Sequence, residues 1–358
     1  MLERAIDDFL TKNSRVTLVL AAGNARDSSG HAQVKAPNLG KTAELKWRVL
    51  PDDYTDSFLE VWFDTVCADR SVTLIVTPPN GLSSVTVPMG STELLLDASG
   101  YTLASVISMK TSPDGLKRSM FLIAIAPTNP KDKQLPAAPH GVWKVEIRND
   151  ALDPAVKVNA WIERDNPVFN ESGPRRQSFF EDSRCNPLVV TGQGTLGSLA
   201  GSGEAIVVGG RYRRGSASIG CNVLPLSKVA KYSSRGPGRA GHVQGPDLIA
   251  PSDDSPVLAG LLAAANRSGA KFRMDGTSVA APIVTRRVGN ILGAQNPPSN
   301  RTALMLKLLG PPPLGNDPNL AGERGYVEPG VEPTPAPFGP LLIALKSKAK
   351  LGKRKAKR

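Results

Sequence analysis

The residues best suited to do chemistry lie in one short run, from position 274 to 282. It reads Met-Asp-Gly-Thr-Ser-Val-Ala-Ala-Pro, so Ser278 follows a glycine-containing turn and opens a stretch of small and apolar residues that predicts a helix. The first backbone N–H groups of a helix have no partner within it, so they could stabilise an oxyanion formed when the hydroxyl attacks a carbonyl. A plain helix start, capped by Ser or Thr, is the alternative interpretation.

Four other segments come before this run. Residues 16–20 predict a buried strand that leads into Ala-Ala-Gly-Asn at 21–24, and residues 205–210 predict a second apolar strand. Residues 232–237 read Tyr-Ser-Ser-Arg-Gly-Pro, and residues 246–251 read Pro-Asp-Leu-Ile-Ala-Pro. Each pattern is weak alone, so the order of the five segments along the chain is the informative feature.

In that order, ending on Gly-Thr-Ser-x-Ala-x-Pro, the segments resemble the core of the subtilisin-like serine proteases (subtilases). The resemblance covers roughly residues 1–30 and 185–310. It implies a serine-type endopeptidase that acts on protein or peptide substrates.

The resemblance also implies roles for particular residues. Ser278 would attack the scissile carbonyl and form an acyl-enzyme. The side-chain amide of Asn24 and the backbone N–H of Ser278 would hold the oxyanion. Ala21, Ala22 and Gly23 would line the pocket for the substrate residue before the scissile bond.

Two of the three triad members have no matching motif. In subtilases the catalytic aspartate and histidine precede the Ala-Ala-Gly-Asn strand, but residues 1–19 contain no histidine. Glu3, Asp7 and Asp8 lie on a predicted helix and are expected on its solvent face. We therefore expect the C-terminal portion of a longer catalytic domain, inactive by itself. A catalytically inactive subtilase-like scaffold or binding protein is the alternative.

The three histidines do not supply the missing base. His31 is expected in a polar loop, His140 in a turn-rich loop and His242 in a glycine-rich loop, and none matches a position of the family. No pair of histidines or cysteines has the spacing of metal ligands. We therefore expect neither a metal site nor a cofactor.

Cysteine usage and hydropathy argue against a disulfide-rich protein and against a membrane-spanning one. Cys67, Cys185 and Cys221 are odd in number and far apart, so they predict no disulfide framework. No signal peptide is recognised at the N-terminus. No apolar run approaches the ~20 residues of a membrane span, so none is expected. Subtilases are often secreted, and the compartment stays open.

The net charge of +12 is concentrated at one end of the chain. Residues 346–358 contain eight basic and no acidic residues, which predicts a solvated, disordered tail. Weak contact with an anionic surface is the alternative. Before the tail, residues 311–345 are rich in proline and glycine and are expected to form a linker.

Residues 41–165 are expected to form an inserted antiparallel β-sandwich. Short alternating runs separated by turn signals predict a series of strands. Tryptophans can form the core of such a domain or grip a ligand from its surface, and the core is favoured. All four tryptophans of the chain fall in this region: Trp47, Trp62, Trp143 and Trp161.

Together these patterns predict an α/β fold. The subtilase-like segments, at 1–40 and 166–310, are expected to form a layer structure with a mostly parallel sheet whose N-terminal part is missing. The β-sandwich at 41–165 interrupts that layer structure.

Overall fold

The computed structural model describes residues 2–79, 81–111, 118–165, 176–181, 189–213, 229–238 and 244–309. The linker at 311–345 and the basic tail at 346–358 lie outside these ranges, and the expectations for them remain predictions. Across the described ranges, no helix is both long enough and apolar enough to cross a membrane.

Three apolar segments form a small parallel sheet in the order β1-β13-β14. β13 is buried along nearly its whole length, as expected for a strand covered on both faces. The bounds are β1 (Val19–Ala21), β13 (Ile206–Tyr212) and β14 (Leu248–Asp253).

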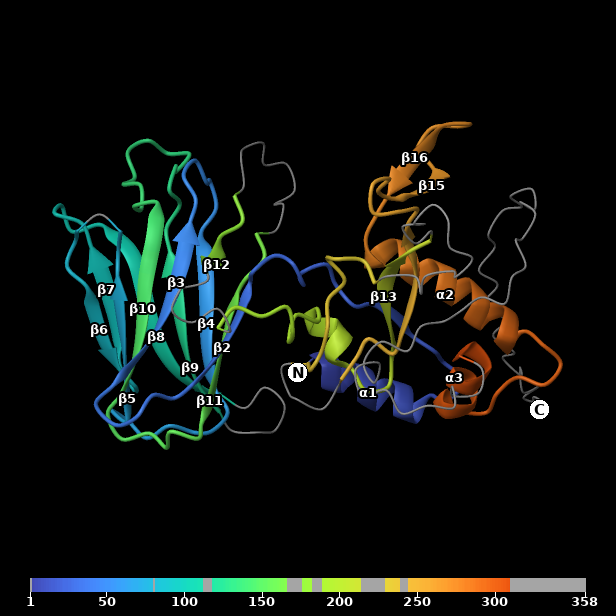
Figure 1. The fold of residues 1–358 in the computed structure, drawn as a ribbon, viewed down its shortest axis with the longest axis horizontal. Helices are drawn as coiled ribbons and strands as arrows, with labels where there is room; N and C mark the ends of the chain where they lie inside the picture. Colours follow the sequence, from blue (N-terminus) through green and yellow to red (C-terminus); the bar gives the residue numbers. More distant parts are fainter. Residues whose placement is uncertain are drawn as a thin grey trace, which may run out of the picture. The chain divides into compact units, whose positions relative to one another are not determined.

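Helices cover both faces of this sheet, because each face presents apolar side chains. On one face, Val208 and Leu248 pack with Val284 of α2 (Thr277–Leu292), and α3 (Arg301–Leu309) adds Leu304. Figure 1 shows α2 beside β13. On the other face, Val207 packs against the 3-10 helix η1 (Ser198–Gly201).

The N-terminal helix α1 (Leu2–Lys12) is fixed by one of its acidic residues. Asp7 was expected on the solvent face, but its Oδ1 accepts hydrogen bonds from the Ser202 hydroxyl at 2.5 Å and the Glu204 N–H at 3.1 Å. Asp7 therefore caps the loop that enters β13.

Most of the remaining strands form two antiparallel sheets. One has the order β12-β3-β10-β5-β6, and the other has the order β2-β11-β4-β9-β8-β7. The first consists of β3 (Thr42–Val49), β5 (Val72–Thr77), β6 (Val85–Pro88), β10 (Gly141–Asn149) and β12 (Phe179–Glu181). The second consists of β2 (His31–Lys35), β4 (Ser57–Phe63), β7 (Thr92–Leu96), β8 (Thr102–Thr111), β9 (Arg118–Ile125) and β11 (Lys157–Ile162).

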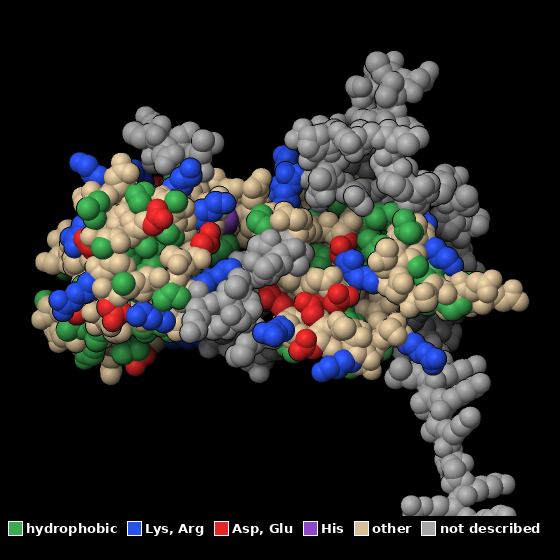
Figure 2. Space-filling model, turned by 90° about the horizontal axis from the view of Figure 1, so that it is seen from below, with side chains coloured by type: hydrophobic (Ala, Val, Ile, Leu, Met, Phe, Trp, Pro, Cys, Tyr) green, Lys and Arg blue, Asp and Glu red, His purple; other side chains and the backbone are tan. Residues whose placement is uncertain are grey.

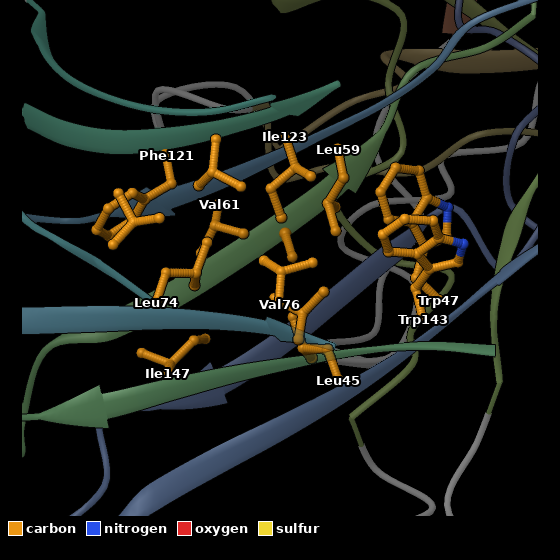
Figure 3. Close-up of a cluster of buried hydrophobic side chains, with 14 of the residues drawn as sticks. Leu45, Trp47, Leu59, Val61, Leu74, Val76, Phe121, Ile123, Trp143 and Ile147 are labelled. Atoms are coloured by element: carbon orange, nitrogen blue, oxygen red, sulfur yellow. The ribbon is translucent and has the colours of Figure 1, made fainter. Parts of the chain in front are cut away.

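A single apolar core joins these two sheets. Every second residue of β4 is buried, so one face of the strand points inward throughout. Figure 3 shows Val61 of β4 beside Leu74 of the other sheet, with Leu59 in the same cluster. Packing of two sheets face to face across such a core is the arrangement of a β-sandwich. The sheets also include β2 and β12, which lie outside the range 41–165.

The prediction of a mostly parallel α/β layer structure is wrong for this chain. Among the described residues, only the three-stranded sheet is parallel and there are only three α-helices. The five- and six-stranded sheets are antiparallel, and so is the two-stranded ribbon of β15 (Leu261–Ala264) and β16 (Lys271–Met274). The segment between β1 and β13 supplies most of the strands. The chain crosses repeatedly between the two antiparallel sheets, so within them only β5–β6, β7–β8 and β8–β9 are paired strands that also follow one another in sequence.

The described surface carries charges of both signs. Figure 2 shows lysine and arginine side chains interspersed with aspartate and glutamate over the face that it presents. On that face the described lysine and arginine side chains therefore do not form a single patch.

Two tryptophans form a matched pair in the sandwich core. Trp47 and Trp143 are opposite each other on β3 and β10, and both are fully buried. The Trp143 indole N–H donates to the Pro139 carbonyl at 3.0 Å, whereas that of Trp47 has no partner among the described residues. The two side chains thus share their burial and differ in hydrogen bonding.

This difference predicts unequal costs for the same substitution. Trp143→Phe leaves the Pro139 carbonyl without its donor, whereas Trp47→Phe removes an unpaired polar group. We expect Trp143→Phe to lower the free energy of unfolding by about 1–3 kcal/mol more than Trp47→Phe does. Urea unfolding of both variants measures this, and equal losses would contradict the prediction.

The chain that forms the sandwich also buries two carboxylate oxygens. Oδ2 of Asp53 and Oδ2 of Asp165 are both buried without a hydrogen-bond partner among the described residues. Burial, with Asp53 and Glu163 nearby, raises the pKa of Asp165 to about 6. Asp165 therefore holds a proton in the folded chain at pH values where the unfolded chain has already lost it.

The raised pKa predicts stability that falls as pH rises. Below pH ~4 Asp165 is protonated in both states, between pH ~4 and ~6 only the folded state keeps the proton, and above that range the destabilisation is complete. Asp165→Asn should raise the melting temperature by about 2–4 °C at pH 7.5 and by less at pH 4. The exposed Asp64→Asn serves as the control, and a gain for Asp165→Asn that does not depend on pH would refute this account.

Candidate active site

Two segments far apart in the sequence meet at the start of α2. The Asn24 side-chain oxygen accepts two hydrogen bonds from Thr277, one from its N–H at 3.0 Å and one from its hydroxyl at 2.9 Å. The Thr277 hydroxyl in turn accepts from the Gly23 N–H at 3.1 Å. Because its oxygen is held in this way, the orientation of the Asn24 amide is fixed and its NH₂ group points away from Thr277.

The turn before α2 requires glycine. Gly276 has φ of 105°, and a Cβ placed on it would lie 2.8 Å from Nδ2 of Asn24. Any larger residue would combine backbone strain with a clash against the amide. The Asn24 NH₂ group therefore lies directly beside the turn that leads into Ser278.

Ser278 occupies an exposed position in the first turn of α2, next to the buried Thr277. Within the described residues, nothing accepts the N–H of Ser278 or the NH₂ group of Asn24. The site therefore has a hydroxyl that solvent can reach and two hydrogen-bond donors that are free to bind an oxyanion.

A tyrosine holds the turn from behind. The Gly276 N–H donates to the Tyr232 hydroxyl at 2.9 Å, and that hydroxyl donates to the carboxylate of Asp253. Burial, together with the hydrogen bond to Asp253, raises the pKa of Tyr232. The tyrosine therefore stays protonated at neutral pH, and Asp253 directs its O–H so that a lone pair faces Gly276.

The two serines after Tyr232 bind the loop after β1 and the strand β13. Ser234 accepts the Ala25 N–H at 2.9 Å on its hydroxyl, and its own N–H donates to the Gly23 carbonyl at 3.0 Å. The Ser233 hydroxyl accepts the Gly210 N–H at 3.0 Å. The Tyr-Ser-Ser segment thus connects the loop after β1 with β13.

The expected pocket residues differ in exposure. Ala21 and Gly23 are partly exposed at the end of β1, but Ala22 is fully buried against Val207 and η1. Ala22 therefore presents no surface to a ligand, and the pocket-lining role expected of Ala21 and Gly23 stays a prediction.

Neither of the two described histidines bonds to Ser278. His31, expected in a polar loop, is instead a buried residue of β2, because its ring stacks on Trp161 with centroids 4.7 Å apart. Its Nδ1 lies 2.5 Å from the Gln193 carbonyl oxygen, and its Nε2 lies 3.2 Å from Oδ1 of Asn159. His140 is exposed before β10, and His242 lies outside the described residues.

Several residues that matter at this site were not identified from the sequence. Thr277 and Tyr232 lie inside the matched segments, but no sequence pattern indicates their hydrogen bonds. Asp253 lies just after the Ala-Pro of its segment and is 2% exposed. In the described part of the chain, no group of three or more His, Cys, Asp or Glu residues could hold a metal ion.

Comparison with solved structures finds the CspB protease of Clostridium perfringens, with a TM-score of 0.60 and 20% sequence identity. The match covers 91% of this chain and 60% of that one, so the chain spans about 60% of the length of its structural neighbour. No family model and no curated protein match the sequence. At this identity the likeness establishes a shared fold.

The Tyr232 network predicts a specific loss of stability. Tyr232→Phe removes the acceptor of the Gly276 N–H and a donor to the buried Asp253 carboxylate, so we expect it to cost about 1–3 kcal/mol of unfolding free energy. Tyr101→Phe is the matched control because Tyr101 is 51% exposed. Urea unfolding compares the two, and a cost for Tyr232→Phe no larger than that of the control would refute the anchoring role.

Proposed function

We propose that this chain is the C-terminal portion of a subtilase-type serine endopeptidase, with Ser278 as its nucleophile. The observation that carries the proposal is the locked Asn24 amide. Its oxygen is held by Thr277, while its NH₂ group and the Ser278 N–H remain available beside an exposed hydroxyl. The fold shared with a protein described as a protease supports the same conclusion.

In the proposed reaction, Oγ of Ser278 attacks the scissile carbonyl carbon and gives its proton to a base. The carbonyl oxygen becomes an oxyanion that the Asn24 NH₂ group and the Ser278 N–H bind. The base returns the proton to the departing amine, and water then hydrolyses the acyl-enzyme. The base would be a residue other than His31 and His140, and an aspartate would orient it.

A catalytically inactive scaffold is the second candidate. The specific observation in its favour is that neither described histidine bonds to Ser278. Without a base, a serine hydroxyl is a weak nucleophile even beside an intact oxyanion site.

Labelling with a fluorophosphonate distinguishes the two candidates. We compare the chain as it stands with a chain extended by the sequence encoded upstream in the same frame, and we assay casein hydrolysis in parallel. The extended chain should label and cleave, and Ser278→Ala should abolish both, whereas Ser268→Ala, in an exposed loop, should change neither. An inactive extended chain would favour the scaffold, and full activity of Ser278→Ala would overturn the proposal.

Kinetics of the active form test the oxyanion donor. Asn24→Ala should lower kcat by ~10²–10³ with little change in KM, because the amide binds the transition state rather than the substrate. A loss confined to KM would contradict the role assigned to Asn24.

A further inference from the structure

A single buried carboxylate lies behind the turn that leads into Ser278. Asp253, at the end of β14, is almost fully buried and bonds to two other segments of the chain. Its Oδ1 accepts the Gly260 N–H at 2.8 Å, and its Oδ2 accepts the Tyr232 hydroxyl. The Ser252 hydroxyl lies 2.9 Å from the same Oδ2. Both oxygens of this carboxylate therefore have donors.

The carboxylate decides which way the Tyr232 hydroxyl points. A phenol carries one proton and a carboxylate can only accept, so the proton faces Asp253. The lone pairs of the Tyr232 oxygen then accept the Gly276 N–H at 2.9 Å. If the proton turned toward Gly276, two donors would face each other and this bond would be lost.

That N–H belongs to the turn that carries both proposed oxyanion donors. Thr277, which follows Gly276 and precedes Ser278, holds the Asn24 oxygen. Gly276 also lies so close to the Asn24 amide that a Cβ on it would come within 2.8 Å of Nδ2. A shift of Gly276 would therefore move the Ser278 N–H and the Asn24 NH₂ group out of place together.

The strand that enters this turn is held by the same carboxylate. Gly260 has φ of 73°, and a Cβ on it would lie 2.9 Å from the backbone of Met274, so the two backbones pack directly against each other. The Gly260 carbonyl also accepts from Arg273 at 2.8 Å. Met274 is the last residue of β16, just before the turn at Gly276. Asp253 therefore restrains both the turn and the strand that leads into it.

We propose that Asp253 is a positioning residue of the active site, which sets the place of the Gly276 turn, and so of both oxyanion donors, through the Tyr232 hydroxyl. The inference rests on the proposed function and adds to it a residue that touches no substrate. What Asp253 supplies is two acceptor oxygens in fixed directions, which an amide of the same size does not offer.

The substitution Asp253→Asn separates these two oxygens. The Gly260 N–H can only donate, whereas the Tyr232 hydroxyl can also accept, so the remaining oxygen should face Gly260 and the new NH₂ group should face Tyr232. That NH₂ group then competes with the Gly276 N–H for the lone pairs of the Tyr232 oxygen. The turn loses part of its anchor, while the ribbon keeps its bond.

Amide hydrogen exchange in the chain as it stands measures this loss without any activity. The reference is the Ala22 N–H, which bonds to the Val208 carbonyl at 2.9 Å. Relative to it, Asp253→Asn should speed exchange of the Gly276 amide about tenfold. In a Tyr232→Phe background the same substitution should change the rate less than about twofold, because the hydroxyl that links the two groups is gone.

Tyr232→Phe alone should also speed exchange at Gly276, and it keeps the test valid if Asp253→Asn does not fold. Exchange at Gly276 that is unchanged in Tyr232→Phe would overturn the inference. So would an effect of Asp253→Asn that is the same with and without the Tyr232 hydroxyl.

Kinetics of the extended chain distinguish positioning from a general loss of stability. Asp253→Asn should lower kcat about tenfold with less than a twofold change in KM, because displaced donors bind the transition state less well. Asp247→Asn is the matched control, since Asp247 accepts from the Val207 N–H and from Arg301 at the opposite end of β14. It should lower stability and leave kcat within about twofold. Equal falls in kcat for the two variants would overturn the inference.

The two measurements also separate this inference from the proposed function. The expected exchange at Gly276, together with an extended chain that neither labels nor cleaves, would refute the proposed function and leave the anchoring of the turn by Asp253 in place. An active extended chain whose kcat does not respond to Asp253→Asn would refute the positioning role alone.

Discussion

The candidate site depends on one pair of hydrogen bonds, from the N–H and hydroxyl of Thr277 to the side-chain oxygen of Asn24. These bonds connect the end of β1 to the start of α2 across 253 positions of sequence. Because one oxygen accepts both, the amide cannot rotate without losing two bonds at once. The other half of the amide is left to bind a ligand, and Gly276 has to be a glycine to make room for it.

A second set of hydrogen bonds holds in place the turn from which Thr277 bonds to Asn24. Tyr232 holds the Gly276 N–H, and the buried Asp253 holds both Tyr232 and the base of the β15–β16 ribbon. In a buried environment, hydrogen bonds to a carboxylate are strong, and leaving one unmade is costly. The turn, the tyrosine segment and the ribbon therefore form one connected unit.

The β-sandwich has its own core and meets the segment around residue 194 through aromatic side chains. The Trp161 indole N–H donates to the Gly194 carbonyl at 2.7 Å, and His31 lies against the Gln193 carbonyl. The same segment continues to the tyrosine region, because the Thr195 N–H donates to the Arg235 carbonyl at 2.9 Å. A short stretch of backbone thus contacts the sandwich on one side and the site-forming segments on the other.

The sequence alone pointed to Ser278 and the Asn24 loop as the candidate site and to the strand-rich middle of the chain, because each has local signals: glycine-containing turns, apolar runs and alternating patterns. It misjudged the sheet type, the environment of His31 and the exposure of Ala22. Strand pairing, the stacking of His31 on Trp161 and the burial of Ala22 under η1 are all contacts between segments distant in sequence. The bonds of Thr277, Tyr232 and Asp253 likewise join separate segments, so only the tertiary structure could show which donors of the site are held and which are left to bind a ligand.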